Sequence, residues 1–100
     1  MLSPFNRREY QSMFDSVCDK TIVVKFGAAW CKICKDMAPD VEKLRLEYAD
    51  VVFIDYDLDK IEHEHDGNVK APPAFKVFKK GVETGSFGGN NLSRLRELLS

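Results

Sequence analysis

Two cysteines separated by two residues are the part of this sequence best suited to covalent chemistry. Cys31 and Cys34 occur in the segment Trp30-Cys31-Lys32-Ile33-Cys34, where a β-branched stretch gives way to a helical pattern. At a helix N-terminus, unpaired N–H groups and the positive end of the helix dipole favour a thiolate, which is the nucleophile of disulfide exchange. The spacing therefore predicts a reversible disulfide, with Cys31 attacking and the less exposed Cys34 resolving the mixed disulfide.

The same cysteine pair could instead be half of a zinc site. His63, His65 or Cys18 would then complete the four ligands. The two histidines are two positions apart and would not share a helix face, and the sequence has no second CxxC pair. We therefore favour redox chemistry, interpret both histidines as solvated surface residues, and interpret Cys18 as a small buried hydrophobic residue.

Composition limits the other classes of function. The chain has 100 residues, of which 44% are hydrophobic and 31% charged, which predicts one globular domain spanning residues 1–100. A net charge of −1 provides no field to hold nucleic acid or an anionic membrane. We find no signal peptide and no segment that could span a bilayer. The expected compartment is the cytoplasm, where a transient, reactive disulfide is more common than a structural one.

The hydrophobic pattern alternates between helices and strands in a way that predicts an α/β fold. A first helix is expected to start at Asn6, with Glu9 completing a capping box, and a last helix at Asn91. The remaining segments are a strand at Thr21–Phe26, a helix from Ile33 to Tyr48, a strand at Val51–Ile54, an acidic turn at Asp55–Asp59, a weak helix within Lys60–Asn68, a hairpin of Phe75–Phe78 and Val82–Phe87 turning at Gly81, and a short edge strand at Leu2–Phe5.

On its motifs, the chain resembles the thioredoxin family over nearly its whole length. The matching segments are Ala29–Lys35, Val69–Phe75, Phe78–Gly81 and Phe87–Asn90. The resemblance implies the thioredoxin fold, an α/β architecture in which a central mixed sheet of order 1-3-2-4-5 carries two helices on each face. It also implies that Cys31 attacks a substrate disulfide, that Cys34 resolves it, and that Pro73 is the cis proline facing the pair.

Partners follow from the same resemblance. It implies a monomer that reduces disulfide-containing protein substrates, needs no bound cofactor, and receives electrons from a thioredoxin-reductase-like flavoenzyme. The apolar surface on which such substrates would dock comprises Trp30, Ile33, Ala71, Pro72 and the Gly88-Gly89 backbone. Lys32, which lies between the cysteines, is counted with this substrate-binding surface.

Two departures from the family pattern concern charge. Lys32-Ile33 replaces the usual Gly-Pro between the cysteines, and the Lys32 ammonium is expected to favour a Cys31 thiolate. Lys25 occupies the position of the family's buried strand aspartate, while Asp55 occupies a position where some members carry lysine. We hypothesise a charge-swapped Lys25–Asp55 pair beneath the cysteines, in which Lys25 stabilises a Cys34 thiolate and Asp55 or a neutral Lys25 accepts its proton. The alternative is a lysine that reaches the strand end while Asp55 stays in solvent.

Two further departures concern the shape of the site. Pro72 has no N–H and so cannot donate one of the backbone bonds with which the family pairs a substrate strand, which predicts weaker or narrower substrate capture. Gly27 and Ala74 stand where many members have tryptophan and threonine, and both replacements open space. These departures keep a second hypothesis open, namely a thioredoxin-like module that binds protein partners with slow or specialised redox chemistry.

Overall fold

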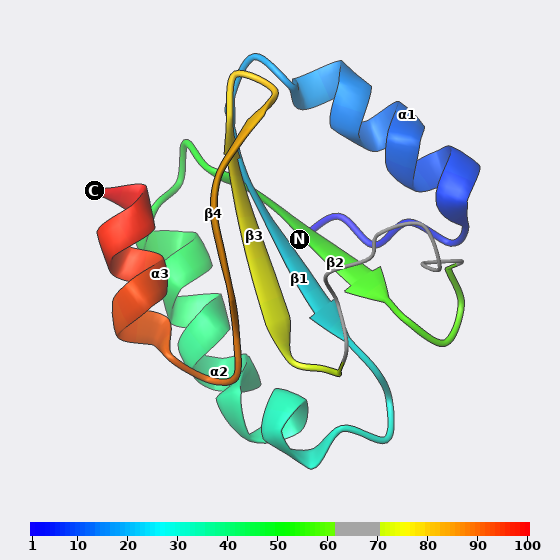
Figure 1. Cartoon of the computed structure of the whole chain (residues 1–100), viewed down its shortest axis with the longest axis vertical. Helices are drawn as coiled ribbons and strands as arrows, with labels where there is room; N and C mark the ends of the chain where they lie inside the picture. The colour runs from blue at the N-terminus through cyan, green and yellow to red at the C-terminus, as the bar shows by residue number, and fades with distance from the viewer. Residues whose placement is uncertain (62–70) are drawn as a thin grey trace.

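Helices and strands alternate along the chain as the hydrophobic pattern predicts. The computed structural model describes residues 1–61 and 71–100, and Figure 1 shows their arrangement. The elements are α1 (Arg7–Val17), β1 (Thr21–Gly27), α2 (Lys32–Glu47), β2 (Val52–Asp57), β3 (Ala74–Lys79), β4 (Val82–Gly88) and α3 (Leu92–Leu99). In these ranges, no helix has the length and apolar character needed to cross a membrane.

The strands form one mixed sheet in the order β2-β1-β3-β4. β1 and β2 run parallel, whereas the β1–β3 and β3–β4 pairs are antiparallel. The fifth strand predicted at Leu2–Phe5 is reduced to a single parallel bridge between Leu2 and Ile54, on the outer edge of β2. The bridge stops there because Pro4 has no N–H to extend it and Asn6 already caps α1. The predicted mixed sheet is therefore confirmed, but it has four strands instead of five, with a single bridge in place of the predicted first strand.

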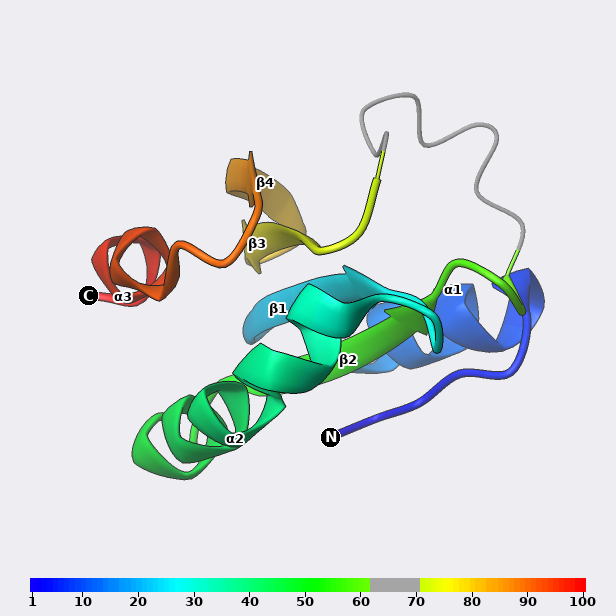
Figure 2. The ribbon, with the colours of Figure 1, turned by 90° about the horizontal axis from the view of Figure 1, so that it is seen from below.

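The two faces of the sheet have separate cores because side chains alternate along each strand. On one face, Val23 and Phe53 pack with Val41 of α2 and Leu95 of α3. The opposite face packs mainly against α1, with Tyr56 buried in its cluster. Figure 2 shows α1 on the side away from α2 and α3. The expectation of two helices on each face is met on the α2–α3 face. The second helix expected on the α1 face is the weak helix predicted within Lys60–Asn68. That segment lies largely within residues 62–70, outside the described residues.

The strand after α2 is longer than predicted, and this correction matters for the site. The acidic residues from Asp55 were expected to form a turn, but β2 continues to Asp57. Three further pairs with β1, beginning with Lys25↔Asp55, extend the ladder, and Tyr56 is fully buried on the α1 face. Burial of the aromatic ring and the continued ladder outweigh the turn preference of the aspartates.

Local signals place the ends of the outer elements as expected. The Asn6 side chain accepts a hydrogen bond from the Glu9 N–H at 2.8 Å, and Glu9 reaches back to the Phe5 N–H at 3.0 Å. The Asn91 side chain caps α3 by accepting from the Arg94 N–H at 3.2 Å. These caps fix where α1 and α3 begin and hence how they lie on the sheet.

Candidate active site

Cys31 and Cys34 meet where β1 passes into α2. Their sulfur atoms form a disulfide, with the two Cα atoms 5.3 Å apart. Cys31 is the N-cap of α2, and its Sγ accepts a hydrogen bond from the Cys34 N–H at 3.2 Å. Each cysteine is 5% exposed, so the expected difference in exposure between them is not present in the disulfide form.

The start of α2 is suited to holding negative charge on Cys31. No acidic residue lies in the first turn of the helix, and the free N–H groups there point toward the N-cap. These groups together carry roughly half a positive charge, which stabilises an adjacent anion. Once the disulfide is reduced, the same Cys34 N–H is therefore placed to stabilise a Cys31 thiolate.

The loop before the cysteines is held in place by the end of β2. Trp30 is 68% exposed, yet its Nε1–H donates to Asp59 Oδ1 at 3.1 Å. The Asp59 N–H in turn donates to Asp57 Oδ1 at 2.9 Å, and the Leu58 N–H donates to the Gly27 carbonyl at 2.9 Å. These bonds tie the loop that follows β2 to the loop that carries Cys31.

The predicted proline loop lies next to the end of β1. The Pro72–Pro73 peptide bond is cis, and Pro73 is buried and accepts a hydrogen bond from the Gly89 N–H at 2.8 Å. The last antiparallel pair is Phe26↔Ala74, so the register places Pro73 beside Gly27. Of the predicted docking residues, Ile33, Ala71 and Gly88 are exposed, like Trp30, while Pro72 and Gly89 are half-buried.

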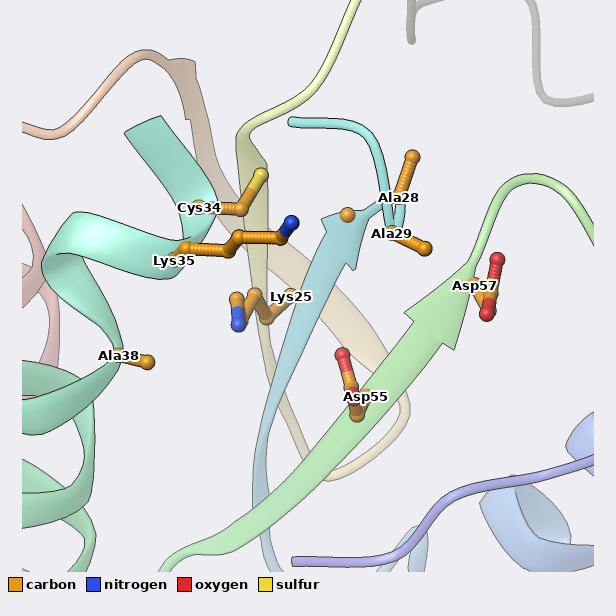
Figure 3. Close-up of a pocket in the computed structure, with 9 residues that line it drawn as sticks. Lys25, Ala28, Ala29, Cys34, Lys35, Ala38, Asp55 and Asp57 are labelled. Atoms are coloured by element: carbon orange, nitrogen blue, oxygen red, sulfur yellow. The ribbon is translucent and has the colours of Figure 1, made fainter. Parts of the chain in front are cut away.

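A cavity of about 240 Å³ lies behind the disulfide, between α2 and the ends of β1 and β2. Figure 3 shows Lys25, Lys35 and Asp55 extending into this space, with Cys34 on its helix side. A methyl group added at Gly27 would lie 3.6 Å from Cys34 Sγ, so the glycine leaves room beside the sulfur. The lining residues are Lys25, Gly27, Ala28, Ala29, Cys34, Lys35, Ala38, Asp55 and Asp57.

The hypothesised Lys25–Asp55 pair is brought into this one cavity. The two residues are register partners on adjacent parallel strands and both are half-buried. In residues 1–61 and 71–100, however, no ion pair or hydrogen bond joins them. The Lys25 side chain instead reaches toward Gly27, whose added methyl would lie 3.8 Å from Lys25 Cε. Both charges thus share the cavity with Cys34 without neutralising each other directly.

Lys32 is directed away from the disulfide and toward the next helical turn. Its Nζ donates to Asp36 Oδ2 at 2.9 Å, and the two side chains are 84% and 62% exposed. This hydrogen bond, followed by the attraction between the two charges, raises the pKa of Lys32 above its ordinary value. Lys32 therefore keeps its charge at neutral pH, but Asp36 and solvent offset that charge before it reaches Cys31.

Two of the residues considered as zinc ligands, His63 and His65, lie outside the described residues. Within the described part of the chain, no three His, Cys, Asp or Glu side chains group as metal ligands. Cys18 is a half-buried free cysteine near the end of α1.

Several residues of the site were not predicted from the sequence. Asp59 holds Trp30, Asp57 and Lys35 line the cavity, and Asp36 pairs with Lys32. The Lys32–Asp36 spacing of four positions within a helix was a readable signal. The Trp30–Asp59 contact had no such signal because it joins residues 29 positions apart.

Comparison with known proteins identifies close sequence relatives. The family model described as Thioredoxin matches residues 2–100. Human thioredoxin is 33% identical over 96 residues, which cover 95% of this chain and 91% of the human protein. Thioredoxin from Callithrix jacchus is 36% identical over 92 residues, covering 91% of this chain and 88% of the relative.

Solved structures agree with the sequence relatives. The X-ray structure of Fasciola hepatica thioredoxin superimposes with a TM-score of 0.87 at 34% identity and covers 97% of this chain and 94% of that one. The crystal structure of a reduced Schistosoma mansoni thioredoxin pre-protein gives a TM-score of 0.89 at 28% identity, with 98% and 93% covered. The fold of this chain is thus similar to the folds of these two proteins over nearly their whole length.

The position of Lys32 predicts that it has little influence on the redox equilibrium. Because its ammonium is exposed and paired, we expect Lys32→Gln to change the equilibrium constant with glutathione by less than about twofold. In an Asp36→Asn background, where the ammonium is free, the same change should favour the disulfide more strongly. Equilibration in glutathione buffers measures both; a tenfold shift from Lys32→Gln alone would contradict the prediction.

Proposed function

Because the chain belongs to the thioredoxin family and is a thiol–disulfide oxidoreductase that reduces protein disulfides, we propose that Cys31 is its nucleophile and Cys34 its resolving residue. The observation that carries this assignment is the hydrogen bond from the Cys34 N–H to Cys31 Sγ at the start of α2. It gives the two sulfurs different environments, since the Cys31 sulfur receives a backbone donor and the helix dipole. Cys34 Sγ instead faces a cavity that contains titratable groups.

The reaction then proceeds in two balanced exchanges. The Cys31 thiolate attacks one sulfur of the substrate disulfide, forms a mixed disulfide and releases the other substrate sulfur as a thiolate, which takes up a proton. Cys34 loses its proton and attacks Cys31 Sγ, which forms the Cys31–Cys34 disulfide and releases the second substrate thiol. Two electrons pass to the substrate, and the disulfide seen in the structure is the end state of the enzyme.

Substrate capture involves the exposed surface around Cys31. Trp30 and Ile33 are 68% and 50% exposed and lie one position before and two positions after that cysteine. Pro72 and the cis Pro73 are proposed to face the substrate strand, as the family pattern implies. Pro72 cannot donate a backbone hydrogen bond to the substrate strand. We therefore expect substrate binding to be weaker, by about 0.5–1.5 kcal/mol or up to about tenfold in affinity, than in a thioredoxin with a non-proline residue at this position.

Lys25 and Asp55 are proposed to control the proton of Cys34. Both residues line the same cavity as Cys34. The Lys25 side chain and Cys34 Sγ both approach Gly27. A half-buried ammonium stabilises a nearby thiolate, and a carboxylate in the same space accepts its proton. Lys25 therefore favours the ionised Cys34 needed for the second exchange, whereas Asp55 receives the proton.

Other features extend the proposal beyond the site. We assign a thioredoxin-reductase-like flavoenzyme as electron donor, a monomeric state and a cytoplasmic location. The redox-active Cys31–Cys34 pair supports the cytoplasmic location, because disulfides in that compartment are usually transient and catalytic. The alternative of a binding module with slow chemistry is favoured by the altered Pro72 and Lys25 positions and is distinguished by the trapping experiment below.

Replacing the resolving cysteine should arrest the reaction halfway. In a Cys18→Ser background, we expect Cys34→Ser to accumulate a mixed disulfide with oxidised insulin, visible by mass spectrometry and lost on adding dithiothreitol. Cys31→Ser should form no such complex and should lose turnover. Full insulin reduction by Cys31→Ser would contradict the assignment, and failure of Cys34→Ser to trap insulin would favour the binding module.

The two cavity charges should move the reactivity of Cys34 in opposite directions. In a protein whose sole remaining cysteine is Cys34, we expect Lys25→Met to raise the pH at which iodoacetamide labelling is half-maximal, because a stabilising cation is lost. Asp55→Asn should lower it, because a repelling anion is lost. Lys20→Met, which removes an exposed lysine before β1, is the matched control. A pH profile unchanged by Lys25→Met would remove Lys25 from the mechanism.

A further inference from the structure

A second hollow, a groove of about 170 Å³, lies beside the active site on the side of α2 that faces α3. Its α2 residues recur at intervals of three and four positions, which places them on one face of the helix. The groove begins at Ile33, the residue that precedes Cys34. The lining residues are Ile33, Asp36, Met37, Asp40, Asn90 and Leu92.

The groove combines an apolar wall with an acidic end. Ile33 is 50% exposed, and Met37 and Leu92 continue the apolar surface beneath it. Asp36 and Asp40, both exposed, follow along the helix. Lysine and arginine side chains have the matching construction, because a hydrocarbon stem covers apolar surface while the cationic tip stays at a polar edge.

Of the two carboxylates in this groove, Asp40 has no ion-pair partner among the described residues. Asp36 is already paired with Lys32. Asp40 makes no ion pair or hydrogen bond with any of residues 1–61 and 71–100, and its carboxylate is free to accept a cation. The N-terminus of α3 contributes at most about half a positive charge nearby, and the Asn91 side chain already accepts from one of its N–H groups. Asp40 therefore offers a carboxylate whose charge is at most partly offset by the start of α3.

The distance from the disulfide suits a substrate residue close to the reacting cysteine. Seven positions separate Ile33 from Asp40, or about 10 Å along the helix axis at 1.5 Å per residue. An extended substrate strand covers that length in about three residues. If the substrate strand lies over Ile33, a basic side chain roughly three positions from the substrate cysteine would therefore begin near Asp40, and its cationic tip would reach that carboxylate.

We propose that this groove selects protein substrates that carry a lysine or arginine about three residues from the reactive cysteine, with Asp40 as the acceptor. The proposal rests on the thiol–disulfide exchange at Cys31 assigned above and adds the class of substrate. Asp36 supports the preference but contributes less, because Lys32 engages its carboxylate. A contact at Asp40 would thus add to substrate capture, to which Pro72 contributes no backbone N–H.

The test uses disulfide-linked homodimers of one short cysteine peptide, with Lys, Gln or Glu three positions before or after the cysteine. The reduced Cys18→Ser protein is mixed with each peptide, and the single tryptophan, Trp30, reports oxidation through its fluorescence. At low salt, we expect the lysine peptide to react about three to ten times faster than the glutamate peptide on one side of the cysteine, and the ratio to shrink at high salt.

Variants separate a local from a general charge effect. Asp40→Lys should reverse the preference and Asp40→Asn should weaken it. Asp19→Lys is the matched control. It makes the same change in net charge at an exposed residue that precedes β1, at the end of that strand far from the cysteines. This variant should keep the preference for the lysine peptide over the glutamate peptide. Equal rates for the lysine and glutamate peptides, with the glutamine peptide reduced normally, would overturn the selection of basic substrates by the groove but not the thiol exchange. An equal effect of Asp19→Lys and Asp40→Lys on the peptide preference would do the same. Failure to reduce any peptide would overturn the thiol exchange as well.

Discussion

The hydrogen bond from the Cys34 N–H to Cys31 Sγ is the interaction on which the rest of the site depends. It exists because Cys31 is the N-cap of α2, a position that leaves helix N–H groups without carbonyl partners. The sheet and helices hold it in place: β1 delivers the chain to Cys31, and the end of β2 fixes the intervening loop through Asp59 and Trp30. A small core of mostly apolar residues thereby positions one polarised sulfur at the start of α2.

The charged residues near this sulfur differ in effect because their surroundings differ. Lys32 is next to Cys31 in the sequence, but it is exposed and paired with Asp36, so solvent and the carboxylate screen it. Lys25 is six positions away, yet it shares a half-buried cavity with Cys34, where screening is weaker. Asp40 lies further along α2, and among the described residues it has no ion-pair partner. Proximity in sequence therefore does not decide which charged side chains share the cavity with Cys34.

Much of the fold could be predicted from the sequence because local signals and burial agree. Asn6 and Asn91 cap the helices that they were expected to cap, and the strands β1, β3 and β4 lie where β-branched and aromatic residues cluster. Prediction failed where tertiary contacts outweighed local preference: Asp55 and Asp57 were assigned to a turn but extend β2, because Tyr56 between them is buried. In the site, the cysteine pair was evident from spacing, whereas the Asp59 contact with Trp30 required the folded structure.

The pH dependence of alkylation of Cys31 tests the central claim most directly. In reduced Cys18→Ser protein, the native state and the same protein in urea are each labelled with a limiting amount of iodoacetamide across a pH series, and the labelled cysteine is located by peptide mapping. We expect the native Cys31 to reach half-maximal reactivity at a lower pH than in urea, with Cys34 labelled far more slowly. Identical profiles for native and unfolded Cys31 would show that the start of α2 does not stabilise its thiolate.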